Sequence, residues 1–225
     1  MPRGCSNWTL PGIDVARGAR VQPPRSLYYR PMTESDVLTL FRRSGALHEG
    51  HFRLSSGLHS PGYLQCALVL MRPRDAEALG AALGERVRVL GATHVLSPAL
   101  GGIVIGQEVA RALDLPALFA ERVDGALTLR RGFVITPSDR VLVVEDVVTT
   151  GGSTRETMAV AREAGATVVG ACAIVDRSGG NPGLDVPFHA LLPMNLPTYP
   201  PESCPLCERG VPLVKPGSRP GASQS

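Results

Sequence analysis

The 225-residue sequence predicts an α/β protein built on an open, mainly parallel twisted sheet that is flanked by helices. Apolar, β-branched runs at residues 141–145 and 167–176 are typical of parallel strands, which are buried on both faces. Helical patterns separate such runs, and strands that alternate with helices favour a parallel sheet. A hydrophobic fraction of 44% against a charged fraction of 19% argues against disorder and is sufficient for a full core.

The first third of the chain predicts two helices and a small hairpin. Thr33 and Asp36 form a capping-box-like pair that begins a helix. Residues 50–64 alternate in polarity and are rich in turn residues, which predicts a short hairpin. Pro73 suits the first turn of a helix that runs to Gly91.

Strand and helix patterns alternate from residue 93 onward. We expect strands at 93–96, 116–121, 127–135, 141–145 and 167–176, and helices at 102–113 and 153–164. The strand at 127–135 follows a turn at Asp124-Gly125 and would pair antiparallel with its predecessor. The parallel strands end on one edge of the sheet, which is where ligands of such folds bind.

Glycine and proline divide the chain into three parts. They gather in residues 1–30 and again from residue 179 onward. We therefore expect a flexible N-terminal extension at 1–30 and a Pro/Gly-rich tail at 191–225. The main domain would span 31–190 and include the small segment 48–66.

Composition limits the setting and the partners of the chain. A net charge of +3 is too small to indicate a nucleic-acid partner. No apolar run reaches transmembrane length and residues 1–30 lack the hydrophobic core of a signal peptide, so we expect no membrane partner. The cysteines are odd in number, and Cys66 and Cys172 lie in apolar stretches, which favours a cytoplasmic setting over a disulfide framework.

Residues 141–154 carry the strongest functional signal. Glu145 and Asp146 follow an apolar strand, and threonines and a glycine pair then open a helix. Helix N-termini favour phosphate, and adjacent carboxylates suit sugar hydroxyls and bound Mg²⁺. The motif is not a Walker A loop, because no Gly-Lys-Ser/Thr follows the glycines, and it is not a dinucleotide fingerprint, because the acids precede the glycines.

Three further segments each allow two interpretations. Residues 97–102 form either an anion-binding loop or an ordinary tight turn before a helix. Arg177 either presents its guanidinium to a planar acidic ligand or pairs with Asp176 or Glu145. Residues 121–132 carry three arginines and form either a mobile basic loop that closes on a phosphorylated substrate or a plain hairpin.

The 141–154 motif resembles the signature of type I phosphoribosyltransferases, which bind phosphoribosyl pyrophosphate. Residues 50–63 contain the order Phe-x-Leu-x-Ser-Gly-x-x-Ser-x-x-Tyr, which is similar to the N-terminal motif of the orotate phosphoribosyltransferase family. With the turn at 98–102 and the Asp176-Arg177 pair, the resemblance extends from about residue 33 to residue 177. It implies the type I phosphoribosyltransferase fold, with 48–66 as an N-terminal hood segment.

The resemblance also implies an activity and a set of site residues. Ribose 5-phosphate would pass from phosphoribosyl pyrophosphate to orotate in pyrimidine biosynthesis, with Mg²⁺ carried mainly by the substrate pyrophosphate and no protein metal ligand assigned. Glu145, Asp146 and Arg122 would be catalytic, and Thr149 and Arg177 would contact orotate. Phosphoribosyl pyrophosphate would lie against Ala99, Leu100, Gly101 and Gly102 (pyrophosphate), Arg122, Glu145, Asp146, Val147 and Val148, and Thr149, Thr150, Gly151, Gly152 and Ser153 (5′-phosphate).

The chain departs from the family pattern in two places. Longer bacterial members have a lysine at the position of Ser55 and a Lys/His-rich catalytic loop at the position of residues 121–131. Because no lysine occurs in that loop, Arg122 is the substitute candidate, with Arg130 and Arg131 behind it. In the family this loop reaches into the neighbouring subunit's site, which implies a homodimer.

Cysteines and histidines outside these motifs also allow several interpretations. Cys204 and Cys207 have the spacing of metal ligands, but no second such pair exists, so a structural turn that clips the tail is favoured over a metal or redox role. His48, His51 and His59 lack helical spacing, which favours ordinary loop polarity.

Two other functions compete with the orotate reaction. A purine phosphoribosyltransferase would share the fold, but Arg177 favours an anionic base. A regulator that binds nucleic acid would need a basic face or an added DNA-binding domain, and the charge and the short N-terminal segment offer neither.

Overall fold

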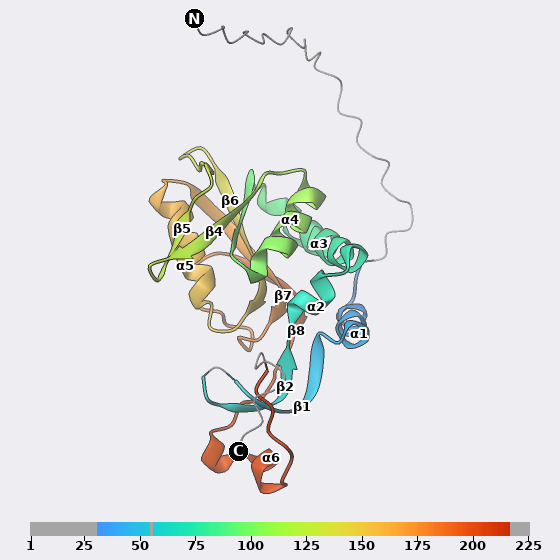
Figure 1. The fold of residues 1–225 in the computed structure, drawn as a ribbon. Helices are drawn as coiled ribbons and strands as arrows, with labels where there is room; N and C mark the ends of the chain where they lie inside the picture. The colour runs from blue at the N-terminus through green and yellow to red at the C-terminus, as the bar shows by residue number, and fades with distance from the viewer. Residues whose placement is uncertain (1–30, 55, 217–225) are drawn as a thin grey trace, which may run out of the picture. The chain divides into compact units, whose positions relative to one another are not determined.

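The computed structural model describes residues 31–54 and 56–216. The chain divides into two units, Met1–Arg30 and Pro31–Ser225. The expected flexible extension at 1–30 lies outside the described residues. Within the second unit the described strands form a six-stranded and a two-stranded sheet (Figure 1).

The six-stranded sheet confirms the predicted mainly parallel architecture. Its strand order is β5-β4-β3-β6-β7-β8, and only the β4–β5 pair is antiparallel. The strands are β3 (His94–Pro98), β4 (Ala117–Val123), β5 (Ala126–Leu129), β6 (Arg140–Val148), β7 (Thr167–Asp176) and β8 (Phe188–Pro193).

Helices cover both faces of this sheet. The helices are α1 (Glu34–Ser44), α2 (Cys66–Leu70), α3 (Pro73–Val87), η1 (Arg88–Leu90), α4 (Gly101–Leu113) and α5 (Gly152–Glu163). Successive side chains of β6 point to opposite faces, so Leu142 packs in a core cluster with residues of α1 to α4, whereas Val143 packs with Met158 of α5. Accordingly, α3 and α4 lie on one side of the sheet and α5 on the other (Figure 1).

Local signals place the ends of the first helices where the sequence predicts. The Asp36 N–H donates to Thr33 Oγ1 (3.2 Å) and the Thr33 N–H donates to Asp36 Oδ2 (2.8 Å), which is a complete capping box. Helix α3 begins at Pro73 and ends at Val87, and the turn of η1 carries the chain to Gly91 at φ 62°.

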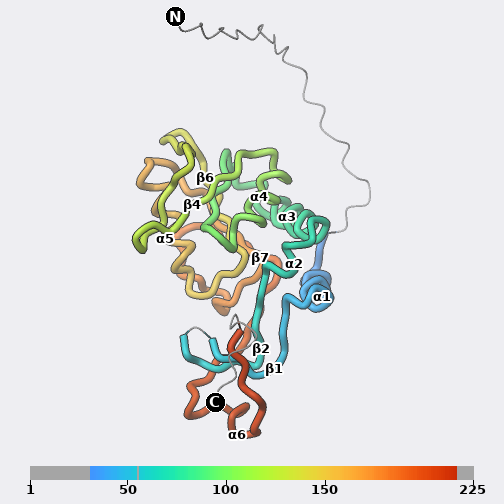
Figure 2. Tube along the Cα trace, in the orientation of Figure 1, coloured from blue at the N-terminus to red at the C-terminus, as the bar shows by residue number. Residues whose placement is uncertain are grey.

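The two-stranded sheet is the predicted hairpin, and the C-terminal segment lies against it. Strands β1 (Leu47–Arg53) and β2 (His59–Leu64) pair antiparallel. The N–H groups of His59 and Tyr199 donate to each other's carbonyl oxygens at 2.8 Å, and the Val214 N–H donates to the His51 carbonyl (2.8 Å). Short helices η2 (Pro201–Ser203) and α6 (Pro205–Glu208) belong to this segment (Figure 2).

These contacts correct the expected C-terminal boundary. The division expected between 190 and 191 falls inside β8, and Tyr199 and Val214 of the expected Pro/Gly-rich tail form bridges with the hairpin. Strand β8 and helix α2 are additions that the sequence patterns did not predict.

Other predicted bounds differ from the structure. The antiparallel strand expected at 127–135 is the shorter β5, because Arg131 (φ 63°) and Gly132 (φ 74°) turn the chain away from the extended conformation. Strand β6 continues to Val148, past the expected end at 145, because β7 pairs with it along its whole length. In the described part of the chain, no helix is long and apolar enough to cross a membrane.

Candidate active site

The sheet opens between β3 and β6. These strands pair only as far as Leu96 and Val143, whereas β6 and β7 remain paired to Val148 and Asp176. From β3 the chain passes through α4 to β4 on one side, and from β6 it passes through α5 to β7 on the other. Open α/β sheets bind ligands at such a topological switch point, beyond the carboxyl ends of the strands.

Glu145 and Asp146 lie in the last part of β6, at this opening, and face opposite helices. A Cβ on Gly101 would lie 2.9 Å from both carboxylate oxygens of Asp146, so the absence of a side chain at Gly101 lets the start of α4 lie against that carboxylate. The Glu145 carboxylate instead interacts with the Ser153 side chain in the first turn of α5. The strand alternation thus directs one acid to each helix N-terminus.

Burial makes both carboxylates hard to ionise in the absence of a ligand. Glu145 is only 5% exposed, and burial raises its pKa to about 8; the Asp146 charge adds to this rise and the Ser153 hydrogen bond opposes it. Burial also raises the pKa of Asp146. The N–H of Val147 donates to Asp146 Oδ1 (2.9 Å), and this hydrogen bond opposes the rise. Hydroxyl donors or a cation at this position would stabilise the charged forms.

The loop from Thr149 to α5 has the form of an anion cradle. Gly151 has φ 70°, and a Cβ there would lie 2.3 Å from the Pro182 carbonyl oxygen, so the tight turn requires glycine. The first turn of α5 has N–H groups without acceptors in their own helix. Thr149 and Thr150 are exposed beside it. This arrangement suits a phosphate.

Arg155, which belongs to none of the motifs in the sequence, supports this loop. Its Nη1 donates to the carbonyl oxygens of Thr150 (3.0 Å), Pro182 (3.1 Å) and Gly183 (3.3 Å). The side chain therefore ties the cradle to the loop before β8. Because all three partners are backbone carbonyls, no residue pattern in the sequence marks the contact.

The turn after β3 lines a pocket on the Asp146 side of the sheet. Its Ala99 N–H donates to the Ala120 carbonyl (2.8 Å), and the Leu100 side chain is 85% exposed. The pocket has a volume of about 390 Å³. It is lined by Leu100, Gly101, Val104 and Asp146 on one side and by Gln65, Ala67, Leu70 and Met71, in and around α2, on the other. The unpredicted helix α2 thus supplies a wall of the site.

Arg177 lies at the same edge with an unsatisfied guanidinium. The backbone N–H of Arg177 donates to the Val148 carbonyl (2.8 Å), which holds the residue beside the end of β6. The neighbouring Asp176 carboxylate is engaged by the Ser178 N–H (2.7 Å) and hydroxyl (2.6 Å). Among the residues that the structure describes, Arg177 forms no ion pair, and its buried Nε has no hydrogen-bond partner. The observed contacts favour an anionic ligand over the pairing with Asp176 or Glu145.

Comparisons with known proteins agree with this geometry. A family model described as "Phosphoribosyl transferase domain" matches residues 76–185. The chain is 54% identical over 186 residues to the orotate phosphoribosyltransferase of Carboxydothermus hydrogenoformans, covering 82% of this chain and 97% of that protein. It is 53% identical over 188 residues to the enzyme of the same name from Pelotomaculum thermopropionicum, covering 84% and 99%.

The chain belongs to the orotate phosphoribosyltransferase family. A crystal structure of the Mycobacterium tuberculosis H37Rv orotate phosphoribosyltransferase, in complex with Fe(III) dicitrate, superposes with a TM-score of 0.62 at 25% identity. The superposition covers 71% of this chain and 95% of the Mycobacterium tuberculosis chain. The type I phosphoribosyltransferase fold expected from the sequence is confirmed.

The arginines of residues 121–132 are engaged elsewhere in this family member. Arg122 donates to the Gly125 carbonyl and to Glu156 Oε2 of α5 (2.6 Å). Arg130 and Arg131 both pair with Glu121 (3.7 and 2.6 Å). Asp124 and Gly125 join β4 to β5 in a tight turn with positive φ at both residues. The described contacts favour the plain hairpin over a long mobile loop and do not bring these arginines to Glu145 or Asp146.

Because Glu145 is buried, we expect that replacing it would stabilise the protein and lower its activity. A carboxyl whose pKa rises from 4.5 to about 8 on folding contributes stability that is fully present below pH 4.5 and lost as the pH rises through about 8. Glu145→Gln should therefore raise the melting temperature more at alkaline than at acidic pH. In a protein of this size, each kcal/mol of added stability raises the melting temperature by roughly 2–4 °C.

Thermal unfolding of both proteins at about pH 5 and about pH 9 measures this difference. Turnover should fall in the same variant if Glu145 contacts the ribose, as the family resemblance implies, because the amide carries no negative charge. An equal temperature shift at both pH values would mean that Glu145 does not titrate between them.

Proposed function

We propose that this family member transfers ribose 5-phosphate from phosphoribosyl pyrophosphate to orotate, giving orotidine 5′-phosphate and pyrophosphate on the route to UMP. The observation that carries the proposal is the unpaired Arg177 guanidinium at the sheet edge that also holds the two acids and the phosphate cradle. A fixed guanidinium suits a planar carboxylate through two parallel hydrogen bonds.

The proposed mechanism requires positioning and charge stabilisation more than a side-chain nucleophile. Pyrophosphate leaves C1 of the ribose, positive charge develops on the sugar ring, and the base nitrogen attacks. The start of α4 at Gly101 would hold the pyrophosphate and residues 149–153 the 5′-phosphate. Glu145 and Asp146 would accept hydrogen bonds from the ribose hydroxyls, and Thr149 and Arg177 would orient orotate.

Mg²⁺ fits this site as the proposed cofactor. The Asp146 carboxylate lies against the start of α4, where the pyrophosphate would bind, and its burial-raised pKa means that a cation would stabilise its charged form. When bound, Mg²⁺ would neutralise negative charge on the leaving group. Asp146 would lie near an ion that is carried mainly by substrate oxygens.

Turnover should therefore depend on free Mg²⁺ and recover when the ion returns. Brief exposure to excess chelator should abolish product formation, because substrate bound without the cation leaves the pyrophosphate charge uncompensated. Adding Mg²⁺ beyond the chelator should restore the rate without refolding. Full activity in excess chelator would contradict the proposed role.

The substrate assignment is tested by a turnover assay with orotate, uracil and hypoxanthine as alternative bases. We expect product from orotate and none from the other two, since neither carries a carboxylate for Arg177. Product separation by chromatography measures each reaction directly. Turnover of hypoxanthine alone would move the enzyme to the purine branch of the same fold.

We further infer a homodimer, in which Arg122 of one subunit would act at the neighbouring subunit's site, and a cytoplasmic setting. Residues 121–131 occupy the position of the family's intersubunit loop, and this position supports the dimer. Cys66 and Cys172 are buried free thiols, which suits a reducing compartment. Light scattering of the purified enzyme measures the mass, and a monomer with full activity would contradict the shared site.

A further inference from the structure

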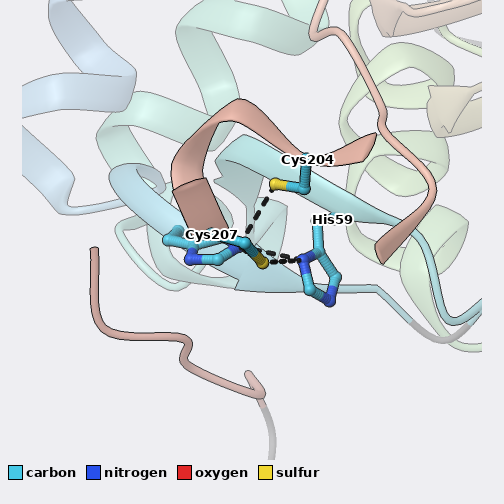
Figure 3. A group of neighbouring side chains, drawn as sticks. His59, Cys204 and Cys207 are labelled. Atoms are coloured by element: carbon cyan, nitrogen blue, oxygen red, sulfur yellow. Dashed lines mark hydrogen bonds between the residues drawn. The ribbon is translucent and has the colours of Figure 1, made fainter. Parts of the chain in front are cut away.

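Four side chains that can ligate a metal meet outside the proposed active site. His51 comes from β1 and His59 from the start of β2, whereas Cys204 directly precedes α6 and Cys207 lies within it. Their ligand atoms all lie within 4.8 Å of one another. His51, His59 and Cys204 are buried, at 2%, 5% and 1% exposure. Figure 3 shows Cys204, Cys207 and His59 pointing toward one another between the hairpin and the C-terminal segment.

Three nitrogen–sulfur separations in this cluster are close to those of a tetrahedral ligand set. His51 Nε2 lies 3.5 Å from Cys204 Sγ and 3.7 Å from Cys207 Sγ, and His59 Nδ1 lies 3.3 Å from Cys207 Sγ. Zinc bonds of about 2.3 Å to sulfur and about 2.0–2.1 Å to nitrogen place tetrahedral N and S ligands about 3.6 Å apart. The nitrogen–nitrogen separation of 2.9 Å is shorter than the corresponding edge of about 3.3 Å, so a small outward shift of one ring completes the geometry.

Hydrogen bonding within the cluster does not account for this convergence. His51 Nδ1 lies 2.7 Å from the Val211 carbonyl oxygen and must donate to it, which leaves Nε2 of the neutral ring with one lone pair. Three polar atoms, from His59, Cys204 and Cys207, surround that single lone pair. A cation at the centre would instead accept an electron pair from each of the four side chains.

We propose that His51, His59, Cys204 and Cys207 bind a structural zinc ion. Two sulfur and two nitrogen ligands in a tetrahedral arrangement are typical of zinc, and four protein ligands leave no open position for catalysis. On binding, each thiol releases its proton, so two thiolates neutralise the ion. A neutral centre suits a site in which three of the four ligands are buried and Cys207 is exposed. The Val211 carbonyl orients His51 as second-layer partners of zinc-bound histidines do.

The ion would join segments that are about 150 residues apart in the chain. Cys204 and His51 are separated by 153 positions, and backbone hydrogen bonds of Tyr199 and Val214 also join the described C-terminal segment to the hairpin. The hairpin carries the 50–63 motif that resembles the family's N-terminal motif. Zinc would therefore fix the position of that motif without contacting the reacting atoms.

Metal analysis of the full-length wild-type protein is the first test. Protein purified without chelator and under a thiol reductant should contain one zinc ion per chain. Replacement by Co²⁺ should give the intense visible absorption of a tetrahedral ion together with a thiolate charge-transfer band. Absence of zinc, combined with failure of the reduced protein to take up either ion, would overturn the proposal.

Variants then identify the ligands. Cys204→Ser/Cys207→Ser should lose at least about nine-tenths of the zinc and the cobalt charge-transfer band. His48→Ala removes a histidine of the same strand that lies outside the cluster, and it should keep both. Zinc retained in the double cysteine variant would contradict the assignment.

A ligand exchange covers the case in which the double variant does not fold. Cys207→His keeps four ligands and should bind Co²⁺ with a weaker charge-transfer band, because one thiolate remains. Mass spectrometry of the freshly purified protein under non-reducing conditions distinguishes a zinc site from a redox-active cysteine pair. A Cys204–Cys207 disulfide in place of bound metal would overturn the zinc site.

Discussion

Replacing Asp146 with asparagine should lower kcat/KM for phosphoribosyl pyrophosphate about 150-fold, which corresponds to ~3 kcal/mol, the usual effect of one fixed polar contact at a reacting centre. Asparagine has the same size, so the close approach of Gly101 persists. The Val147 N–H can still donate to the side-chain oxygen. The variant would lose the negative charge that is proposed to lie beside the ribose and the Mg²⁺-bearing pyrophosphate.

Steady-state kinetics at saturating Mg²⁺ measure this loss, and thermal unfolding shows whether the variant remains folded. Asp185→Asn is the matched control, since this exposed acid pairs with Arg162 at 2.9 Å on the surface. It should leave turnover unchanged, because exposed ion pairs contribute little. Wild-type rates in folded Asp146→Asn would remove Asp146 from the catalytic group.

The parts of the fold that the sequence predicted are those whose signal is continuous and local. Strand β7 has the predicted bounds, because eight of its ten residues are buried and its apolar run is unbroken. The chain order around β6 and α5 was predicted for the same reason. There the acids, the threonines and the glycines are adjacent in sequence, so their order alone places them at a strand end and a helix start.

The missed elements lack such a signal. Helix α2 has five residues, too few to show helical periodicity. Strand β8 lies at the sheet edge, is only partly buried and sits among glycines and prolines, so its pattern resembles a tail. The residues at 127–135 have the sequence pattern of a strand, but Arg131 and Gly132 adopt positive φ angles that end it. A positive φ at a non-glycine residue such as Arg131 is uncommon and cannot be predicted from its residue type.

Contacts between distant segments could not be predicted from the sequence for a different reason. Arg155 acts on carbonyl oxygens, which every residue has. The histidines of the hairpin were interpreted as loop polarity and the Cys204-x-x-Cys207 pair as a clip of the tail. Each pair supplies half of a tetrahedral set, and only the pairing of Tyr199 and Val214 with the hairpin brings the halves together.

Arg177→Ala should raise KM for orotate far more than KM for phosphoribosyl pyrophosphate. Its guanidinium is partly buried, forms no ion pair among the described residues, and has a pKa lowered by desolvation, so an anionic ligand would be its main source of compensation. Losing a charge-assisted contact of this kind should cost roughly 2–4 kcal/mol on the orotate side. Initial-rate kinetics with each substrate varied in turn separate the two effects.

Arg177→Lys distinguishes a bidentate contact from simple charge. Lysine restores the positive charge but cannot make two parallel hydrogen bonds to a planar carboxylate, so it should recover little of the orotate affinity. Full recovery by lysine would mean that charge alone attracts the base. Equal losses for both substrates in Arg177→Ala would instead assign Arg177 to the phosphate cradle, which its backbone hydrogen bond to Val148 already adjoins. In that case the specificity for orotate must come from other residues, and the contact of Thr149 with the base becomes the next one to test.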